Sequence, residues 1–83
     1  MRVETLDDPI DVEVRFSQRG MRPLWFVWRG RRHPVQQVTG VWHEQDGSLR
    51  HRCFSVTDGD AYYELRFDAR ALRWFLTKVA LAG

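Results

Sequence analysis

Cysteine and long apolar runs are almost missing from this 83-residue chain. Its single cysteine, Cys53, has no partner for an internal disulfide, which is typical of proteins from a reducing compartment. No apolar run approaches the ~18 residues of a membrane span. The start, Met1 to Pro9, carries acidic residues where a signal peptide needs an apolar core. We therefore expect a soluble cytoplasmic protein with no membrane partner.

Lysine is equally scarce, because Lys78 is the only lysine and every other cationic side chain is arginine. The net charge of +2 is too small to predict a polyanionic partner by itself. Arginine binds phosphate through two parallel hydrogen bonds and stacks on flat rings, which favours nucleic acid. A genome whose codons favour arginine explains the same composition. Both interpretations stay open at this point.

The motifs of common catalytic and metal sites are also absent. The chain has no G-x-S-x-G stretch, no glycine-rich phosphate loop and no paired zinc-ligand spacing. His51 and Cys53 stand two residues apart, which on a strand places their side chains parallel and not directed at each other. We expect no enzyme activity, no cofactor and no metal.

What the chain does contain is apolar and aromatic material, 43% and 13% of its residues. This content is enough for one folded domain over residues 1–83, and we expect residues 1–8 to be flexible. Residues 10–16 alternate apolar and polar side chains without a break, and residues 61–68 do the same. This period of two predicts half-buried strands.

Three further strands are expected between these two. Residues 24–28 are apolar on both faces, and residues 49–57 lie between two Asp-Gly turn signals. The strand that begins at His33 breaks strict alternation, which predicts a bulge at Gln36-Gln37 or at Gly40. The segment Ser17–Pro23 has the composition of a loop.

The last segment supports two interpretations. Apolar residues recur there at helical spacing, which would make a helix over about 69–82; they are Leu72, Phe75, Leu76 and Val79. Residues 73–79 are rich in strand formers, and we favour a strand. The predicted fold is mainly β, a single antiparallel meander of five to six strands that curls into a barrel or roll. An α+β fold with the C-terminal helix is the alternative.

The stretch WFVWRGRRHPV joins aromatic residues and arginines around one glycine. In one interpretation Arg29, Arg31 and Arg32 at a hairpin tip contact phosphates while Trp28 or Trp25 stacks on a base. In the other interpretation the tryptophans belong to the core and the arginines keep a turn soluble.

The aromatic content also predicts an interaction surface, because stable interfaces are enriched in Trp, Phe, Tyr and Arg. Its candidate residues are Trp25, Trp42, Trp74 and Phe75. The first hypothesis is a non-enzymatic β module that binds a protein partner or forms a homo-oligomer. The second is an accessory nucleic-acid-binding module centred on the arginines at 29–32.

A series of short motifs carries a family resemblance. The motifs are Asp8-Pro9-Ile10-x-Val12, Phe26-x-Trp28-x-Gly30-Arg31, Val35-x-x-Val38-x-x-x-Trp42, Arg52-x-Phe54-x-Val56, Tyr63-Glu64-Leu65 and Trp74-x-Leu76. Together they resemble a family of small uncharacterised bacterial domains of unknown function. Such domains occur alone or at the C-terminal end of Y-family DNA polymerase homologues from mutagenesis cassettes. The resemblance covers residues 8–80 and implies a soluble β domain near DNA repair, without catalytic residues. Residues 69–73 depart from the family's glycine-bearing turn.

Overall fold

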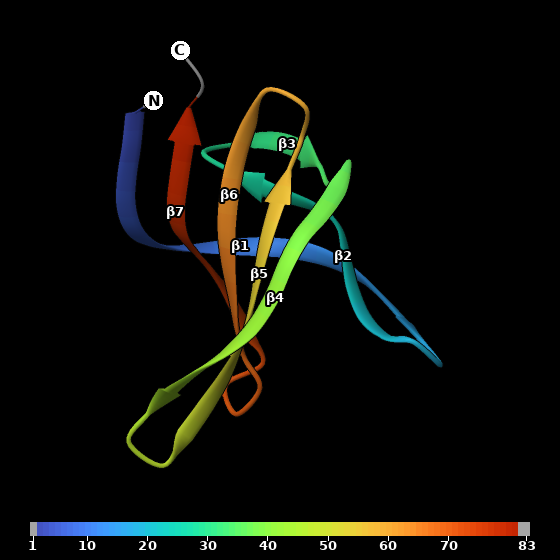
Figure 1. The fold of residues 1–83 in the computed structure, drawn as a ribbon, viewed down its shortest axis with the longest axis vertical. Helices are drawn as coiled ribbons and strands as arrows, with labels where there is room; N and C mark the ends of the chain where they lie inside the picture. Colours follow the sequence, from blue (N-terminus) through green and yellow to red (C-terminus); the bar gives the residue numbers. More distant parts are fainter. Residues whose placement is uncertain (1, 82–83) are drawn as a thin grey trace.

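The computed structural model describes residues 2–81, which form one antiparallel sheet and no helix (Figure 1). The strands are β1 (Arg2–Ser17), β2 (Gly20–Trp28), β3 (Arg31–Pro34), β4 (Gln37–Asp46), β5 (Leu49–Thr57), β6 (Ala61–Asp68) and β7 (Arg73–Leu81). The predicted mainly β class is confirmed. In the described part of the chain there is also no helix of the length and apolarity that a membrane crossing needs.

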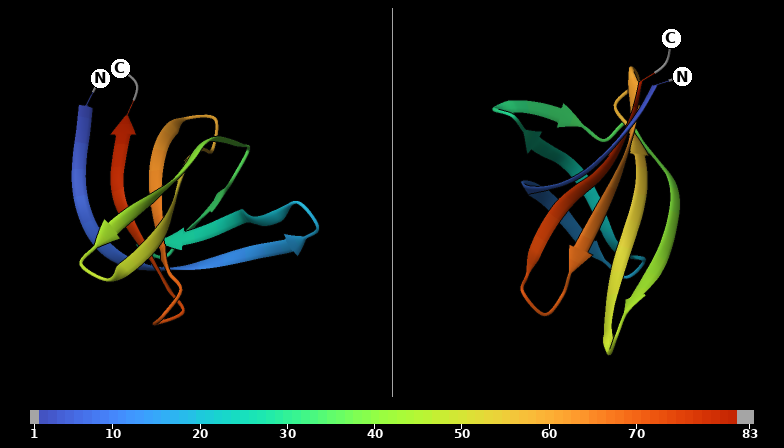
Figure 2. Two further views of the ribbon diagram at one scale, coloured as in Figure 1. Left: turned by 60° about the horizontal axis from the view of Figure 1, so that its bottom comes forward. Right: turned by 90° about the vertical axis from the view of Figure 1, so that its left-hand side faces the viewer.

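The sheet consists of two meanders joined through β1 and β7, in the order β3-β2-β1-β7-β6-β5-β4. The strand β1 belongs to both meanders, because residues 2–10 pair with β7 and residues 11–17 pair with β2. A register shift between Thr5 and Asp8 accompanies a strong bend in this strand, which Figure 1 shows clearly. The bend carries β2 and β3 across one face of β4–β7, and Figure 2 shows the resulting curl from two further sides.

The curled sheet stays open, so the predicted barrel is wrong. The two edge strands of the described sheet, β3 and β4, follow each other in sequence but do not pair as a ladder. Val35 and Gln36 connect them, and their N–H groups donate to the carbonyls of Leu24 at 2.9 Å and Thr57 at 2.8 Å. These two bonds hold the edges near each other without closing the sheet.

The strand count also differs from the prediction, with seven strands in place of five to six. Pro34 has no N–H to donate, and the strand expected from His33 onward divides there into β3 and β4. The expected bulge lies between Val38 and Gly40. Residues 2–8, which we expected to be flexible, form the start of β1, and Ser17–Pro23 is the tip of a hairpin and the start of β2.

The alternative helix over about 69–82 is wrong, because Arg73–Leu81 is the strand β7 between β1 and β6. Its buried residues are Trp74, Leu76 and Val79. A register shift opposite Glu64 and Leu65 moves the inward positions of β7 by one residue after Leu76. The buried positions of β7 are therefore spaced by two residues and then by three. In the sequence this mixed spacing resembles the period of a helix.

The core lies between the two meanders and is built around Phe26, Phe54, Leu65 and Leu76, all of which are almost fully buried. The ring of Trp74 lies 5.6 Å from that of Phe54, measured between centroids. The segment WFVW and the strand of Trp74 share this core as expected, but they are not neighbouring strands, because β1 lies between them.

Candidate nucleic-acid interface

The β2–β3 hairpin places the arginines of the predicted site. Trp28 pairs with Arg31, which leaves a two-residue turn of Arg29 and Gly30. Their φ angles are +52° and +73°, as a type I′ turn requires, and the twist of such a turn matches that of the flanking strands. Glycine adopts this conformation freely, whereas Arg29 adopts it at a cost. The hairpin therefore projects Arg29, Arg31 and Arg32, all exposed, around its tip.

Trp28 lies on the inner face of this hairpin, and only part of its side chain is accessible to an external base. Its ring packs against the core, and its Nε1 donates a hydrogen bond of 2.9 Å to Asp8 Oδ2 on β1. The guanidinium carbon of Arg29 lies 4.4 Å from the ring centroid, as in a cation–π contact. Trp28 therefore anchors the hairpin to β1 and the core and holds Arg29 over its ring.

Trp25 lies on the opposite, outer face of the same strand. It pairs with Glu13 on β1 and with Pro34 on β3, and it is half-buried. The guanidinium carbon of Arg32 lies 4.1 Å from its ring centroid. The two interpretations of WFVWRGRRHPV are thus divided between two tryptophans, because Trp28 faces the core while Trp25 and Arg32 form a stacked pair at the surface.

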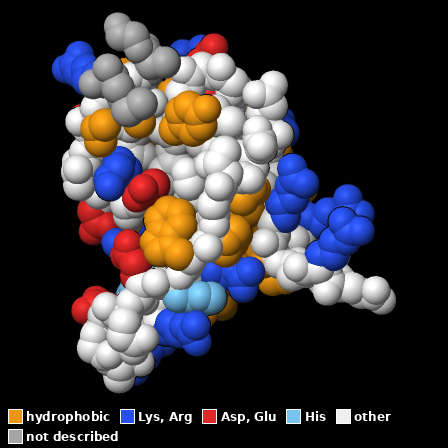
Figure 3. Space-filling model, viewed as in Figure 1, with side chains coloured by type: hydrophobic (Ala, Val, Ile, Leu, Met, Phe, Trp, Pro, Cys, Tyr) orange, Lys and Arg blue, Asp and Glu red, His pale blue; other side chains and the backbone are white. Residues whose placement is uncertain are grey.

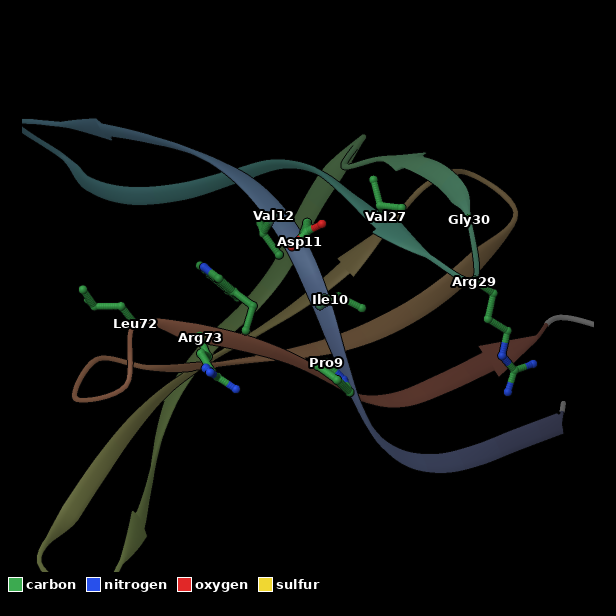
Figure 4. A pocket seen from close by; sticks show the side chains of 10 residues that line it. Pro9, Ile10, Asp11, Val12, Val27, Arg29, Gly30, Leu72 and Arg73 are labelled. Atoms are coloured by element: carbon green, nitrogen blue, oxygen red, sulfur yellow. The ribbon is translucent and has the colours of Figure 1, made fainter.

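A shallow depression of about 580 Å³ extends from the hairpin tip across β1. Figure 4 shows Arg29 on one side of β1 and Arg73 on the other. Pro9, Asp11 and Val27 line the space between them. Arg73, at the start of β7, therefore lines the same depression as Arg29 although the two residues are far apart in the sequence.

Ion pairing separates the arginines into two kinds. Arg66 Nη2 lies 2.8 Å from Asp7 Oδ1, so its charge is matched within the fold. Between residues 2 and 81, no carboxylate lies within ion-pair distance of Arg29, Arg31 or Arg32. The hairpin arginines therefore keep their hydrogen-bonding capacity for an external anion.

A second arginine group was not predicted. Arg15 and Arg22 face each other in the β1–β2 ladder, and Arg19 lies in the turn between them. The lobe formed by this hairpin carries a group of cationic side chains in Figure 3, while most of the acidic side chains in that view lie on the opposite side. The signal in the sequence was the spacing of these arginines around Gly20, which the interpretation of Ser17–Pro23 as a loop concealed.

The residues expected to form an interaction surface are divided between the surface and the interior. Trp42 and Phe75 are half-buried on the outer face of β4–β7. The guanidinium carbon of Arg66 lies 4.8 Å from the ring centroid of Phe75. Trp74 is 8% exposed and packs against Phe54 and Phe67. Its ring is part of the core and contributes almost nothing to a surface.

His51 and Cys53 both lie on the outer face of β5 and are both buried. Burial and, to a smaller extent, the negative charge of Glu44 together raise the pKa of the Cys53 thiol to about 11. The thiol is therefore protonated at neutral pH and is a poor nucleophile. Within residues 2–81, no three His, Cys, Asp or Glu side chains are placed to hold a metal ion.

One polar cluster escaped the sequence analysis. The Tyr63 hydroxyl donates to Asp58 Oδ2 at 2.9 Å, and His33 Nδ1 lies 3.1 Å from the same oxygen. The His33 ring stacks on Phe26 with centroids 5.0 Å apart. We call His33, Asp58 and Tyr63 the clasp, since they join β3 to the β5–β6 turn across the open side of the sheet.

No family model, curated protein or solved structure matches this chain. The resemblance to bacterial domains of unknown function therefore stays a prediction, which rests on the short motifs quoted above. What the chain binds has to be argued from the arrangement of its own side chains.

Proposed function

We propose that this chain is a non-enzymatic β module that binds single-stranded nucleic acid through the β2–β3 hairpin. The observation that supports it best is the stacked pair of Arg32 and Trp25 beside two further arginines without carboxylate partners. Proteins that bind single strands combine cationic contacts to phosphate with flat groups on which bases stack.

The hairpin supplies both elements within a short distance. Arg29 and Arg31 project from its tip, and Arg73 lines the same depression over β1 as Arg29. The guanidinium carbon of Arg32 already lies over the ring of Trp25, 4.1 Å from its centroid. A base stacks on a guanidinium plane as well as on an aromatic ring, so this pair offers a platform while the other arginines contact phosphates. Asp11 in the depression opposes close approach of a backbone phosphate at that one point.

The test is fluorescence anisotropy with a labelled single-stranded DNA oligonucleotide, measured over a range of NaCl concentrations. About four phosphate contacts predict a slope of log K against log salt near −3, since each contact to a single strand contributes about −0.7. The same sequence as a duplex should bind more weakly, because its bases are not free to stack on Arg32 and Trp25.

A matched pair of variants isolates the hairpin. Arg29→Gln, Arg31→Gln and Arg32→Gln together should weaken binding by at least roughly tenfold and flatten the salt slope. Arg2→Gln, Arg50→Gln and Arg70→Gln together remove the same charge elsewhere and should leave most of the binding. Equal losses in the two triple variants, or binding that ignores salt, would contradict the proposal.

A protein-interaction module is the second candidate, and one observation favours it. The strand β4 is an edge of the described sheet, so one side of its ten residues has no neighbouring strand. Val41 on this strand is 49% exposed. An edge of this kind accepts a strand from another chain. The substitution Val41→Lys should abolish any dimer formed there, as measured by light scattering, and a dimer that persists excludes this edge.

A further inference from the structure

A pocket on the outer face of β4–β6 brings three carboxylates around one buried imidazole. His51 on β5 pairs in register with Glu44 on β4. Its Nε2 lies 4.0 Å from Asp46 Oδ2, and its Nδ1 lies 4.0 Å from Asp68 Oδ1 on β6. Both distances are too long for a hydrogen bond. The carboxylates surround the imidazole ring of His51 but form no hydrogen bond with its nitrogens.

The floor of this pocket contains unsatisfied polar atoms. His51 is only 8% exposed, and its Nδ1 is buried without a hydrogen-bond partner. Arg66 Nε, which belongs to another residue lining the same pocket, is also buried and unpartnered. Buried polar groups in folded proteins are almost always hydrogen-bonded. The His51 nitrogen can accept a hydrogen bond from a donor that enters the pocket, whereas Arg66 Nε–H is itself a donor and needs an acceptor.

The shape and charge of the pocket restrict the ligand. It encloses about 500 Å³, and its acidic residues, Asp7, Glu44, Asp46 and Asp68, outnumber the single cation Arg66. Leu49 and Phe75 give it an apolar side. Since the described residues hold no metal-binding arrangement, the charge favours an organic cation that also has apolar surface. A guanidinium on its aliphatic stem meets both conditions.

The β1–β2 hairpin of the same chain has the complementary chemistry. Arg15 and Arg22 stand directly opposite each other, an arrangement that is unfavourable for like charges unless an anion lies near them. Among the described residues, no carboxylate lies within ion-pair distance of Arg15, Arg19 or Arg22. Phe16 beside them is 75% exposed, which supplies the apolar component.

We propose that this pocket binds the arginine-bearing tip of the β1–β2 hairpin of a second copy of the chain. Figure 1 shows that the tip and the β4–β5 end of the sheet project from separate parts of the molecule. The contact therefore joins two different surfaces, so copies associate head to tail. This inference does not depend on the proposed function, which uses the other hairpin.

The test is sedimentation velocity of nuclease-treated protein with two complementary variants. The pocket variant carries Asp46→Asn and Asp68→Asn, and the tip variant carries Arg15→Gln, Arg19→Gln and Arg22→Gln. Wild-type protein at low salt should sediment faster as its concentration rises, and about 0.5 M NaCl should reverse this. Each variant alone should remain monomeric. Their equimolar mixture should form a 1:1 dimer and nothing larger. The intact tip of the pocket variant binds the intact pocket of the tip variant, and only the mutated pocket and the mutated tip are left free.

Two controls keep the test decisive. A variant with Glu4→Gln and Asp60→Asn removes two exposed carboxylates outside the pocket and should associate like wild type. In the mixture, the imidazole NMR signals of His51 in the tip variant should shift, whereas those of His43 should not. A monomeric wild type at every concentration, or a variant mixture without a dimer, would overturn the inference. Folding of every variant is checked by near-UV circular dichroism.

Discussion

The imidazole of His33 lies 3.1 Å from the carboxylate of Asp58, although the two residues belong to opposite ends of the curled sheet. Asp58 also accepts hydrogen bonds from the backbone N–H groups of Asp60 and Ala61 through its other oxygen. One carboxylate therefore shapes the β5–β6 turn and fixes the edge strand β3 over it. The clasp joins the two sides of the curled sheet at one point, whereas a closed barrel would join them by a continuous ladder of strand pairs.

The first prediction concerns the stability that the clasp provides. Asp58→Ala should lower the free energy of unfolding by about 2–4 kcal/mol, because it leaves the Tyr63 hydroxyl without its acceptor and uncaps the turn. Tyr63→Phe should cost less, about 1–2 kcal/mol, since Asp58 keeps its other partners. Urea unfolding followed by tryptophan fluorescence measures both. The control Asp60→Ala changes an exposed neighbouring carboxylate and should have little effect.

The second prediction is a pH dependence that follows from Asp58. Burial alone would raise the pKa of this carboxyl, but the hydrogen bonds from Asp60, Ala61, His33 and Tyr63 outweigh it and lower the pKa to about 2. The unfolded carboxyl has a pKa near 3.8, so its contribution is present above that value and is lost as the pH falls toward 2. The loss should amount to roughly 2 kcal/mol.

Thermal melts between pH 5 and pH 2 measure this loss. The melting temperature of the wild type should fall more steeply with acid than that of Asp58→Asn, whose side chain does not titrate. Parallel curves for the two proteins would show that Asp58 contributes no acid sensitivity.

The third prediction separates two tryptophans that the sequence grouped together. Trp74→Ala should destabilise the fold by about 3–5 kcal/mol, because a buried aromatic ring leaves a cavity. Trp25→Ala removes a half-buried ring from the outer face and should cost about 1 kcal/mol or less. Oligonucleotide binding should respond in the opposite order, with the larger loss in Trp25→Ala, under conditions where both variants remain folded.

The fourth prediction concerns the thiol of Cys53. Its pKa of about 11 means that it should react very slowly with a disulfide reagent at pH 8 and rapidly once the chain is unfolded in urea. The folded state favours the protonated thiol over the thiolate. The stability that depends on this protonated thiol is complete below pH 9 and is lost as the pH rises through 11. Rapid labelling of the native protein would contradict the burial of this side chain.

The strands that could be predicted are those whose two faces differ. Residues 10–16 and 61–68 alternate strictly because one face meets the core and the other meets solvent, and both lie in strands of the structure. The start of β1, residues 2–10, carries three carboxylates and shows no such contrast. Only its distant partner β7 makes it a strand, and a pairing between residues 2–10 and 74–81 leaves no local trace in the sequence.

The candidate site was predicted in composition but not in geometry. The turn at Arg29 and Gly30 follows from local chemistry, and the hairpin forms where it was expected. Which tryptophan faces outward depends on the register of β2 against β1, where an irregularity at Glu13 and Val14 shifts the faces. A shift of one residue reverses every side chain of a strand, so the choice between Trp25 and Trp28 needed the structure.

The dual pairing of β1 has a consequence for the order in which the chain folds. Residues 11–17 find β2 within a short loop, whereas residues 2–10 need β7, which is separated from them by most of the chain. Closing so large a loop costs more entropy than closing a hairpin, so the β1–β7 ladder should be the last to form. During synthesis on a ribosome, the β1–β2–β3 segment would then emerge before β7 has been synthesised. Residues 2–10 of β1 would have no pairing partner at that stage.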